Sequence, residues 1–434
     1  MESYRNYYST DVKEKNHGSK ISLAGWIEDI RNIGSIAFII VRDRKGTFQV
    51  TCLKKDSPEI FEKLVNLSRE SVISVYGLCN PSDKSRNGYE ILPDKIEILS
   101  ISKTPLPLGV VDKVESDLDT RLDNRFIDLR KGKIKAVFKV RNSVIQAVHD
   151  YLQSEKFIEV HTPNIIASSS EGGTDVFKLK YFEKEAFLAQ SPQLYKQSLM
   201  ATGFDRVYEI AWYFRAEEHN TTRHLNESTA VDVEMAFIKD EEDVMKILEN
   251  LVYNMWKKAS DCEEELKSLN RVIDLPKLPF RRIKYDDVVS LLDAEDVDIN
   301  WGDDLGAEHE KMLGKLMKNK GHHFYFITKY PIEAKPFYTN YDGKYSRGFD
   351  LECNGTELAS GSQRIHDVDK LKDRIKANNL SLNGFDFYLK SFEYGMPPHG
   401  GFGFGIERFL MELLDIKNIR ECILFPRDRT RLIP

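Results

Sequence analysis

The sequence lacks most features that would set it apart from ordinary globular proteins. It has only five cysteines and no C-x-x-C pair, so neither a disulfide framework nor a zinc site is expected. No apolar run approaches the roughly 20 residues that cross a membrane. The N-terminal Met1–Asn6 is too polar for a signal peptide, and there are no repeats or low-complexity segments. These absences predict a protein without a membrane span, located in the reducing cytoplasm.

The sequence also has no large excess of charge of either sign. The net charge is −6, which does not indicate nucleic-acid binding, although residues 1–104 carry a small excess of Lys and Arg over Asp and Glu. With 41% hydrophobic and 30% charged residues, the chain has the composition of a folded protein. A length of 434 residues predicts two or three domains with sizeable cores.

The first 104 residues read as a small β domain. Short segments rich in β-branched and aromatic residues alternate with Gly, Asn and Asp turns, which is the pattern of strands. We expect strands at 21–27, 35–43, 47–52, 72–77 and 89–92, and one helix near 59–67. Five short strands and a helix indicate an OB-fold barrel, with a β-meander that binds no ligand as the alternative.

The rest of the chain mixes helices and strands. Residues 105–134, which begin with a Pro-rich stretch and continue densely charged, are expected to be a hinge before a domain at 135–434. Apolar residues at helical spacing predict a helix ending near Ser154, followed by a strand over Phe157–Pro163. A second amphipathic helix is expected over Val244–Met255, with strands at Phe324–Thr328 and Phe349–Cys353.

Two distant segments suit one catalytic task. Phe214–Glu227 contains F-R-A-E and then R-H, and Gly400–Arg408 contains G-x-G-x-x-R. Arginine offers a rigid fork of donors that matches phosphate oxygens, and glycine lets backbone turn sharply or approach a ligand. The alternative interpretation is an exposed charged hairpin and a Gly-rich turn before an ordinary helix.

In this order and spacing, the segments resemble motifs 2 and 3 of the class II aminoacyl-tRNA synthetases. The helix, strand and proline that end at Pro163 resemble motif 1, which forms the dimer interface in that family. A plain helix–strand pair in a monomer is the alternative. The resemblance covers the whole chain and implies an α+β protein: an N-terminal OB-fold barrel, a hinge, and a catalytic domain built on an antiparallel sheet flanked by helices.

The resemblance implies that ATP activates an amino-acid carboxylate, which is then transferred to the 3′ end of a tRNA. Such chemistry needs positioned cations more than acid–base groups. Arg215, Glu217 and Arg408 are the implied catalytic residues. The implied ATP-binding residues are Arg215, Ala216, Glu217, Arg223, His224, Leu225, Glu357, Gly405, Ile406, Glu407 and Arg408. Some relatives stack an aromatic residue on adenine where this chain has Ser228, so what stacks here stays open, with His224 and Arg408 as candidates.

A magnesium site is implied at Glu357 and Ser360, because Mg²⁺ prefers hard oxygen ligands. These two residues match the metal-binding pair of the family. A solvated acidic strand end is the alternative interpretation of the same residues.

The substrate amino acid is implied by two cations. Lys196, within Q-L-Y-K, and Arg364 would together bind a side-chain carboxylate, whereas Glu171 and Asp232 suit an α-ammonium. This pattern resembles the aspartate-specific enzymes of subclass IIb, and the compact length resembles their archaeal type. The implied aspartate-binding residues are Glu171, Gln193, Leu194, Tyr195, Lys196, Arg215, Asp232, Ser360 and Arg364. Lys196 as a mere surface lysine is the alternative.

The implied partners are L-aspartate, tRNA(Asp) and a second copy of the chain. Whether tRNA(Asn) is charged too stays open. Phe38 would stack on an anticodon base, with Gln49 and Glu90 bonding base edges; Phe38 as a core aromatic residue is the alternative. Two rival functions are a ligase that amidates aspartate and a non-catalytic tRNA-binding paralogue. The barrel argues against the first, and the intact Arg215 and Glu217 argue against the second.

Overall fold

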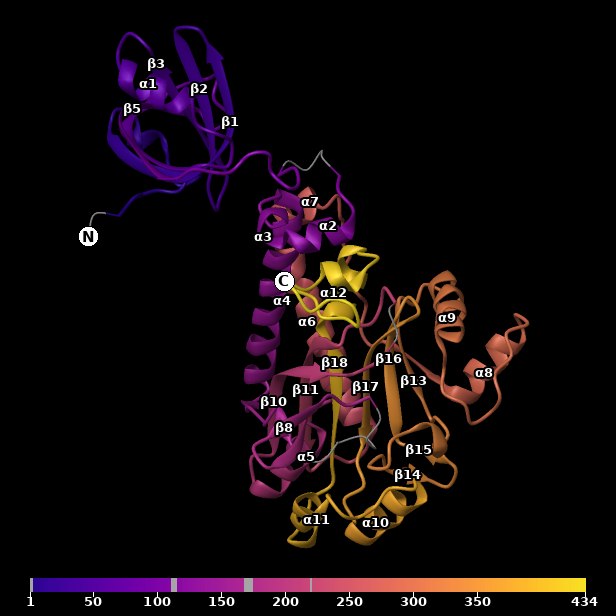
Figure 1. The fold of residues 1–434 in the computed structure, drawn as a ribbon. Helices are drawn as coiled ribbons and strands as arrows, with labels where there is room; N and C mark the ends of the chain where they lie inside the picture. Colours follow the sequence, from indigo (N-terminus) through magenta and orange to yellow (C-terminus); the bar gives the residue numbers. More distant parts are fainter. Residues whose placement is uncertain (1–2, 111–114, 168–174, 219–220) are drawn as a thin grey trace. The chain divides into compact units, whose positions relative to one another are not determined.

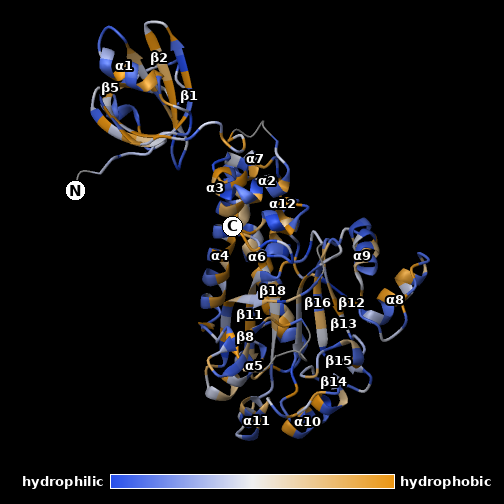
Figure 2. Cartoon of the chain, in the orientation of Figure 1, coloured by the Kyte–Doolittle hydropathy of each residue, from blue (hydrophilic) through white to orange (hydrophobic). Residues whose placement is uncertain are grey.

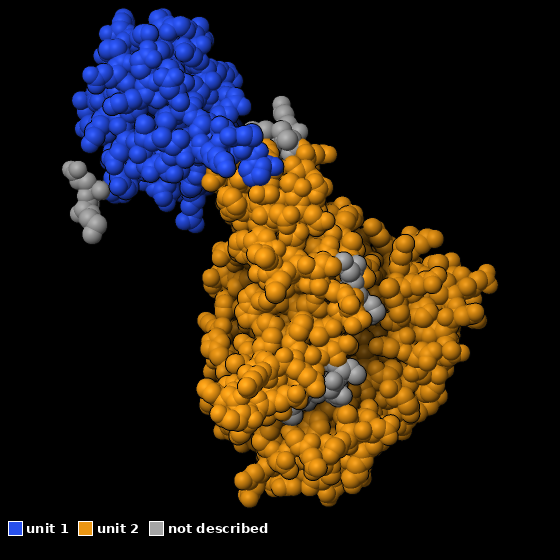
Figure 3. All heavy atoms as spheres, viewed as in Figure 1, with its two compact units in different colours: residues 1–107 blue, residues 108–434 orange. Residues whose placement is uncertain are grey.

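The computed structural model describes residues 3–110, 115–167, 175–218 and 221–434. The chain divides into two compact units, residues 1–107 and 108–434 (Figure 3). Each unit has its own hydrophobic core. Within the described part of the chain, no helix is both long and apolar enough to cross a membrane.

The first unit is a closed five-stranded barrel (Figure 1). Around the barrel the strands follow the order β1 (Lys20–Ile33), β2 (Ile36–Arg42), β3 (Thr47–Leu53), β5 (Tyr89–Ser100) and β4 (Val72–Pro81). Helix α1 (Pro58–Val65) packs on it through Phe61 and Leu64, and a 3-10 turn, η1 (Glu14–Asn16), precedes β1. The apolar residues of these strands are prominent in Figure 2. Closure confirms the predicted barrel.

The second unit is built on an eight-stranded sheet. Its order is β12 (Arg281–Lys284), β13 (Phe324–Thr328), β16 (Gly348–Cys353), β17 (Thr356–Gln363), β18 (His399–Gly405), β11 (Glu227–Ala236), β10 (Arg206–Phe214) and β6 (Ile158–Glu159). Within the described residues of this sheet, only the two edge pairs, β12 with β13 and β6 with β10, are parallel. The predicted mainly antiparallel sheet is therefore confirmed. The strand expected over Phe157–Pro163 is much shorter than predicted, because only two of its residues pair with β10.

Side-chain alternation gives this sheet two different faces. On β11, Val231 and Val233 point into the large core, which also contains residues of helices α4 (Gly132–Ser154) and α6 (Glu241–Ser260). Asp232 and Glu234, one position along, must therefore point to the other face. Helices α4 and α6 cover one face of the sheet, and the opposite face carries these polar side chains beside helix α5 (Gln193–Leu199).

Helix α6 shows why such a segment is helical. The Asp240 side chain caps it by accepting a hydrogen bond from the Glu242 backbone N–H at 3.0 Å, its first turn is acidic, and Lys257 and Lys258 lie in its last turn. The other helices of this unit are α2 (Leu118–Asp123), α3 (Arg125–Asp128), α5 (Gln193–Leu199), α7 (Glu263–Ser268), α8 (Tyr285–Asp293), α9 (Ala307–Asn319), α10 (Val368–Ala377), α11 (Asp386–Glu393) and α12 (Ile406–Leu414). The remaining short elements are β7 (Ile165–Ile166), β8 (Lys178–Tyr181), β9 (Lys184–Leu188), β14 (Tyr341–Asp342), β15 (Tyr345–Ser346), η2 (Met200–Thr202), η3 (Ile332–Ala334) and η4 (Ile419–Glu421).

The charge-dense segment expected to be part of a hinge is structured. It contains α2 and α3, and Arg125 is buried there beside Asp128, with their side chains 2.7 Å apart. Arg125 also donates to the carbonyl of Leu424, 2.9 Å away, near the C-terminus of the chain. Residues 118–128 therefore pack as part of the second unit.

Two glycines bring α9 onto the β16–β17 turn by direct backbone contact. A Cβ at Gly314 would lie 2.3 Å from the backbone nitrogen of Gly355, and one at Gly355 would lie 2.5 Å from the carbonyl oxygen of Glu310. Gly355 also has a φ of +84°, which other residues rarely adopt. This contact places α9 beside the strand that carries Glu357.

Candidate active site

A cavity of about 210 Å³ opens on the sheet face that carries Asp232, opposite α4 and α6. Strands β10, β11, β17 and β18, the start of α12 and the loop between β10 and β11 line it. The structure brings together here most of the site residues predicted from sequence: Gln193, Arg215, Glu217, Arg223, His224, Leu225, Asp232, Glu357, Ser360, Arg364, Gly405, Glu407 and Arg408. The two distant motifs therefore meet in one place.

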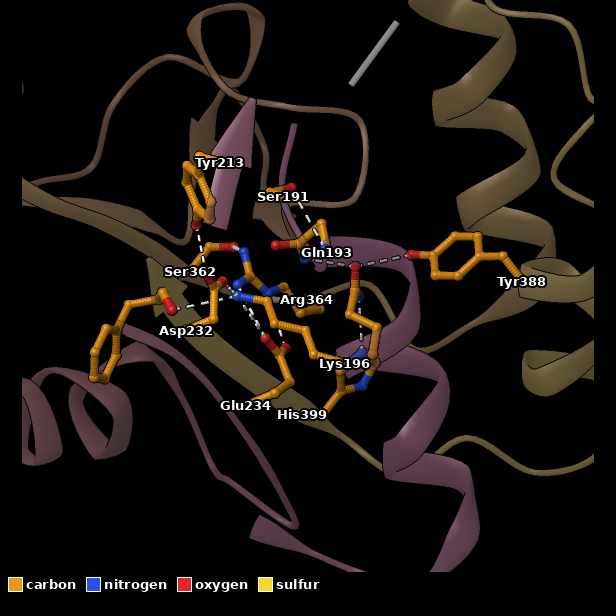
Figure 4. Close-up of polar contacts among 12 residues, drawn as sticks. Ser191, Gln193, Lys196, Tyr213, Asp232, Glu234, Ser362, Arg364, Tyr388 and His399 are labelled. Atoms are coloured by element: carbon orange, nitrogen blue, oxygen red, sulfur yellow. Dashed lines mark hydrogen bonds and ion pairs between the residues drawn. The ribbon is translucent and has the colours of Figure 1, made fainter. Parts of the chain in front are cut away.

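Four buried charged side chains form a cluster (Figure 4), and two of them line the cavity. Arg364 pairs with both carboxylate oxygens of Glu234, at 3.0 and 3.2 Å. Lys196 lies 2.8 Å from Asp232 Oδ1 and 3.5 Å from Glu234 Oε2. We call Lys196, Arg364, Asp232 and Glu234 the buried charge cluster. Two cations and two anions make its formal charge zero.

The buried charge cluster differs from the sequence prediction in two respects. Arg364 and Asp232 line the cavity, but Lys196 does not, because Asp232, Glu234 and the Phe402 carbonyl take up its three donor positions. Lys196 is 3% exposed and so is not a surface lysine. Glu234 was not predicted, although its place two residues after Asp232 on a strand puts both carboxylates on one face.

The cations determine the ionisation of Glu234. Burial alone would raise its pKa, but Arg364 and Lys196 outweigh burial and hold the pKa of Glu234 below its usual range. The hydroxyl of Tyr213, another residue that sequence reasoning missed, donates to Asp232 Oδ2. Each acidic side chain of the cluster thus has a basic neighbour within ion-pair distance.

The glycines of the second motif leave space for neighbouring side chains on one face of the strand. The motif was expected to turn sharply, but Gly401, Gly403 and Gly405 lie on β18, with no positive φ among them. A Cβ at Gly401 would lie 2.2 Å from Glu234 Oε2, and one at Gly403 would lie 2.7 Å from the Tyr213 hydroxyl oxygen. The expectation of a turn was wrong, because alternate glycines in a strand clear one face for the cluster and the cavity.

Arginines approach the cavity from both motifs. Arg215 follows the end of β10, and its guanidinium lies over the Tyr213 ring, 5.4 Å from the centroid. Arg408 on α12 donates to the Glu357 carbonyl at 3.2 Å. Arg223, from the loop between β10 and β11, also lines the cavity. The arrangement forms a cationic lining suited to a polyphosphate.

Negative groups accompany these arginines. Glu217 lies 3.8 Å from Arg215 Nη1 and 4.0 Å from His224 Nε2. Glu407 is buried; it pairs with Arg141 at 2.8 Å and accepts from the Thr229 backbone N–H at 3.0 Å. Glu407 therefore has a structural role beside the cavity.

A β-bulge puts the predicted metal-binding pair on one face of the sheet. Residues three apart in a regular strand point to opposite faces, but Leu358 has no partner on β16. Glu357 therefore pairs with Glu352, and Ser360 pairs with Asp350. Since Asp350 and Glu352 are two residues apart, all four side chains lie on the same face.

The residues present fit a hard cation. Buried oxygens of Asp350 and Glu352 have no hydrogen-bond donor among the described residues. Burial and the Asp350 carboxylate raise the pKa of Glu357. No group of three or more His, Cys, Asp or Glu in the described part of the chain is arranged to hold a metal by protein ligands alone. Mg²⁺ commonly takes one or two carboxylates and completes its shell with water and phosphate oxygens.

Glu310 of α9 reaches the same region and was not predicted. Its carboxylate lies 3.7 Å from Arg223 Nη1. Burial and the nearby Glu357 carboxylate raise the pKa of Glu310 to about 7. Helix α9 contains no residue of the predicted motifs, which explains why no sequence signal marked Glu310.

Several predicted residues do not face the cavity. Leu194 packs in a core cluster with helices α10 and α11, Tyr195 stacks on Phe387 with ring centroids 5.3 Å apart, and Ile406 lies in the main core. Ala216 lies beside the cavity without lining it; its backbone N–H donates to the Asp175 carbonyl. Glu171 lies outside the described residues.

The three predicted anticodon residues share the outer surface of the barrel. Phe38 is partly exposed, whereas its neighbours Ala37 and Ile39 are buried. Gln49 and Glu90 are register partners, and their side chains hydrogen-bond at 3.1 Å. The alternative that Phe38 is a core residue is therefore wrong.

Comparison with known protein families shows which family this chain belongs to. Residues 117–429 match the family described as tRNA synthetases class II (D, K and N), and residues 21–99 match the OB-fold nucleic acid binding domain. The chain belongs to this family of class II tRNA synthetases. The family predicted from sequence and its ligase chemistry are confirmed.

Individual relatives are similar over their full length. An aspartate–tRNA(Asp) ligase of Pyrococcus horikoshii is 53% identical over 99% of this chain and 100% of the relative. An aspartate–tRNA(Asp/Asn) ligase of Methanocaldococcus jannaschii is 48% identical over 100% of this chain and 99% of the relative. An asparaginyl-tRNA synthetase of Pyrococcus horikoshii, solved with asparaginyl-adenylate, superposes with a TM-score of 0.92 at 33% identity, covering 100% of both chains.

Proposed function

We propose that this chain is an aspartate–tRNA ligase. It would activate L-aspartate with ATP, release pyrophosphate and transfer aspartate to the 3′ end of tRNA(Asp). The observation that carries the substrate assignment is the buried charge cluster, in which Arg364 lines the cavity. The archaeal aspartate–tRNA ligases, about half identical over the full length, support it.

The buried charge cluster supports aspartate over asparagine. Arg364 uses three of its five N–H groups on Glu234 and Ser362, so two remain for a substrate carboxylate. The amide of asparagine would place its own N–H donors against this cation. A site built to hydrogen-bond one group strongly rejects an isostere that cannot do so. Asp232, on the cavity wall, would attract the α-ammonium, as would Glu171.

The motif arginines would serve the chemical step. In this proposal Arg215 contacts the α-phosphate and the attacking carboxylate, Glu217 orients a donor group, and Arg408 holds the terminal phosphates. Arg223 and His224 would contact the triphosphate and adenine. Such positioned cations stabilise the charge that develops on phosphoryl oxygens. Mg²⁺, held by Glu357 and Ser360, would supply further positive charge there.

The barrel would recognise the anticodon through Phe38, Gln49 and Glu90. This assignment favours a tRNA ligase over the rival that amidates free aspartate, which needs no such domain. The arginine-lined cavity argues against a non-catalytic paralogue. The relatives include ligases for tRNA(Asp) alone and for tRNA(Asp/Asn), so charging assays with both tRNAs decide that point. We further propose a homodimer in the cytoplasm, where the five free thiols stay reduced.

The amino-acid assignment is tested by ATP–pyrophosphate exchange. The wild type should exchange with aspartate and not with asparagine. Lys196→Leu should lower kcat/KM for aspartate by ~10²-fold or more, because it leaves two buried carboxylates with one cation. Lys390→Leu, on the exposed side of α11, is the matched control and should behave as wild type. Robust exchange with asparagine would refute the assignment.

A further inference from the structure

A chain of buried hydrogen bonds runs behind the cavity, from Gln193 to His399 (Figure 4). Gln193 lines the cavity at the start of α5, and Gln197 lies one turn later on the same helix face. The Gln193 Nε2 donates to Gln197 Oε1 at 2.7 Å. Gln197 Nε2 in turn meets His399 Nε2 at 3.0 Å. Both glutamine side chains and His399 are buried.

One backbone carbonyl determines which group donates and which accepts in each of these hydrogen bonds. His399 Nδ1 lies 2.9 Å from the Pro397 carbonyl oxygen, which can only accept, so Nδ1 carries the ring proton. The neutral ring therefore accepts at Nε2, and Gln197 must present its NH₂ group there. Gln197 then has its Oε1 directed to Gln193, which must present its own NH₂ group. The amide orientation of Gln193 is thus determined by His399.

The ring stays neutral in the working range of the enzyme. Burial, which is the main cause, lowers the pKa of His399 to about 4. Glu234 opposes this effect, whereas Arg364 and His366 add to it, and no other charged group is a leading influence. Tyr388 supports the same arrangement from α11, because its hydroxyl donates to Gln197 Oε1 at 3.0 Å.

We propose that His399 and Gln197 are positioning residues that hold Gln193 with its carbonyl oxygen toward the cavity, as an acceptor for the α-ammonium of the substrate. The Gln193 NH₂ group donates to Gln197, and no described residue donates to the Gln193 Oε1. An ammonium can only donate, so the opposite amide orientation would repel it. This inference rests on the proposed function, since it assigns part of the same amino-acid site.

The test is a double-mutant cycle on the full-length enzyme, measured by aspartate-dependent pyrophosphate exchange. Gln193→Met removes the acceptor and Gln197→Met removes the group that orients it. Each should raise the KM for aspartate roughly 10-fold, the value of one hydrogen bond to a charged group, and leave the KM for ATP unchanged. The double variant should be no worse than Gln193→Met alone, because Gln197 acts only through Gln193.

Two further variants separate positioning from general packing. Tyr388→Phe removes one supporting donor and leaves the His399–Gln197–Gln193 chain intact, so its KM for aspartate should change by less than about threefold. If Gln197→Met does not fold, His399→Asn takes its place in the cycle. The proposal would be overturned if Gln193→Met or Gln197→Met had a KM for aspartate within twofold of wild type. It would also be overturned if the effects of the two substitutions multiplied in the double variant.

Failure of the proposed function gives a different result. In that case the wild type does not exchange pyrophosphate with aspartate at all. The same cycle is then run with whichever amino acid the wild type activates, because every α-amino acid carries the ammonium. If the effects of Gln193→Met and Gln197→Met were additive with that amino acid, the proposed role of His399 and Gln197 would still be overturned.

Discussion

At the scale of single residues, Glu310 shows that burial and like charge can reverse the usual ionisation of a carboxyl group. It lies near Glu357, and the cations Arg408 and Arg223, the latter 3.7 Å away, offset these effects only partly. Its raised pKa means that the folded protein keeps a proton that the unfolded chain releases. Between about pH 4.5 and 7 its contribution must therefore reduce stability as pH rises.

This sign gives a prediction for Glu310→Gln in metal-free buffer. The variant should be more stable than wild type at pH 8 by roughly 2 kcal/mol, and the difference should shrink at pH 5, where wild-type Glu310 is protonated when folded. Urea unfolding at the two pH values measures it. Glu308→Gln, exposed on the same helix, should show no such pH dependence. Equal stability of wild type and Glu310→Gln at both pH values would contradict the assignment.

The residues that sequence reasoning found and missed differ in a physical way. Arg215 and Arg408 were predictable because motif spacing marks them. Glu234 was missed because pairing with Arg364 across the sheet depends on strand order, which one sequence does not state. Lys196 was identified as functional, but its inward direction follows from α5 packing against β11 and β18.

At the scale of elements, long periodic segments were predictable and irregular ones were not. Helix α4 carries clear helical periodicity, and β13 is a run of aromatic and β-branched residues that matches its predicted bounds. The bulge at Leu358 left no mark in composition, yet it decides which side chains face the cavity. The strand β18 was taken for a turn because glycine frequency alone does not distinguish a turn from a strand that must leave space.

The element that ends in β6 carries the prediction of a dimer. β6 is an edge strand whose Ile158 is 45% exposed, and it follows the long helix α4. An apolar edge of this kind is expected to be covered, and a two-fold contact covers it with its own copy. Light scattering at micromolar concentration should give about twice the 50.2 kDa chain mass.

Two variants check that the predicted dimer uses this edge. Ile158→Asp should shift the mass toward the monomer, because it buries a carboxylate in the contact. Ile101→Asp, which changes another exposed isoleucine but on the barrel unit, should leave the mass unchanged. A fully active monomeric wild type would contradict the dimer.

At the scale of the whole molecule, two separate cores imply separate tasks. Phe38→Ala should remove a stacking contact worth ~1–3 kcal/mol and lower tRNA charging by roughly 5- to 150-fold. Pyrophosphate exchange without tRNA should stay normal, because the cavity lies entirely within the second unit. Tyr76→Ala, an exposed aromatic residue on β4, is the matched control. Wild-type charging by Phe38→Ala would show that this face does not read the anticodon.

The zero net charge of the buried charge cluster restricts which substitutions this pocket can accept during evolution. Replacing one of Lys196, Arg364, Asp232 or Glu234 by a neutral residue leaves a buried charge uncompensated, which typically costs about 3–5 kcal/mol. That is a large part of the stability of an ordinary domain. A lineage, or an engineer, that seeks a neutral substrate must therefore exchange a cation and an anion together. A change of substrate charge in this scaffold therefore requires coupled substitutions of an acidic and a basic residue.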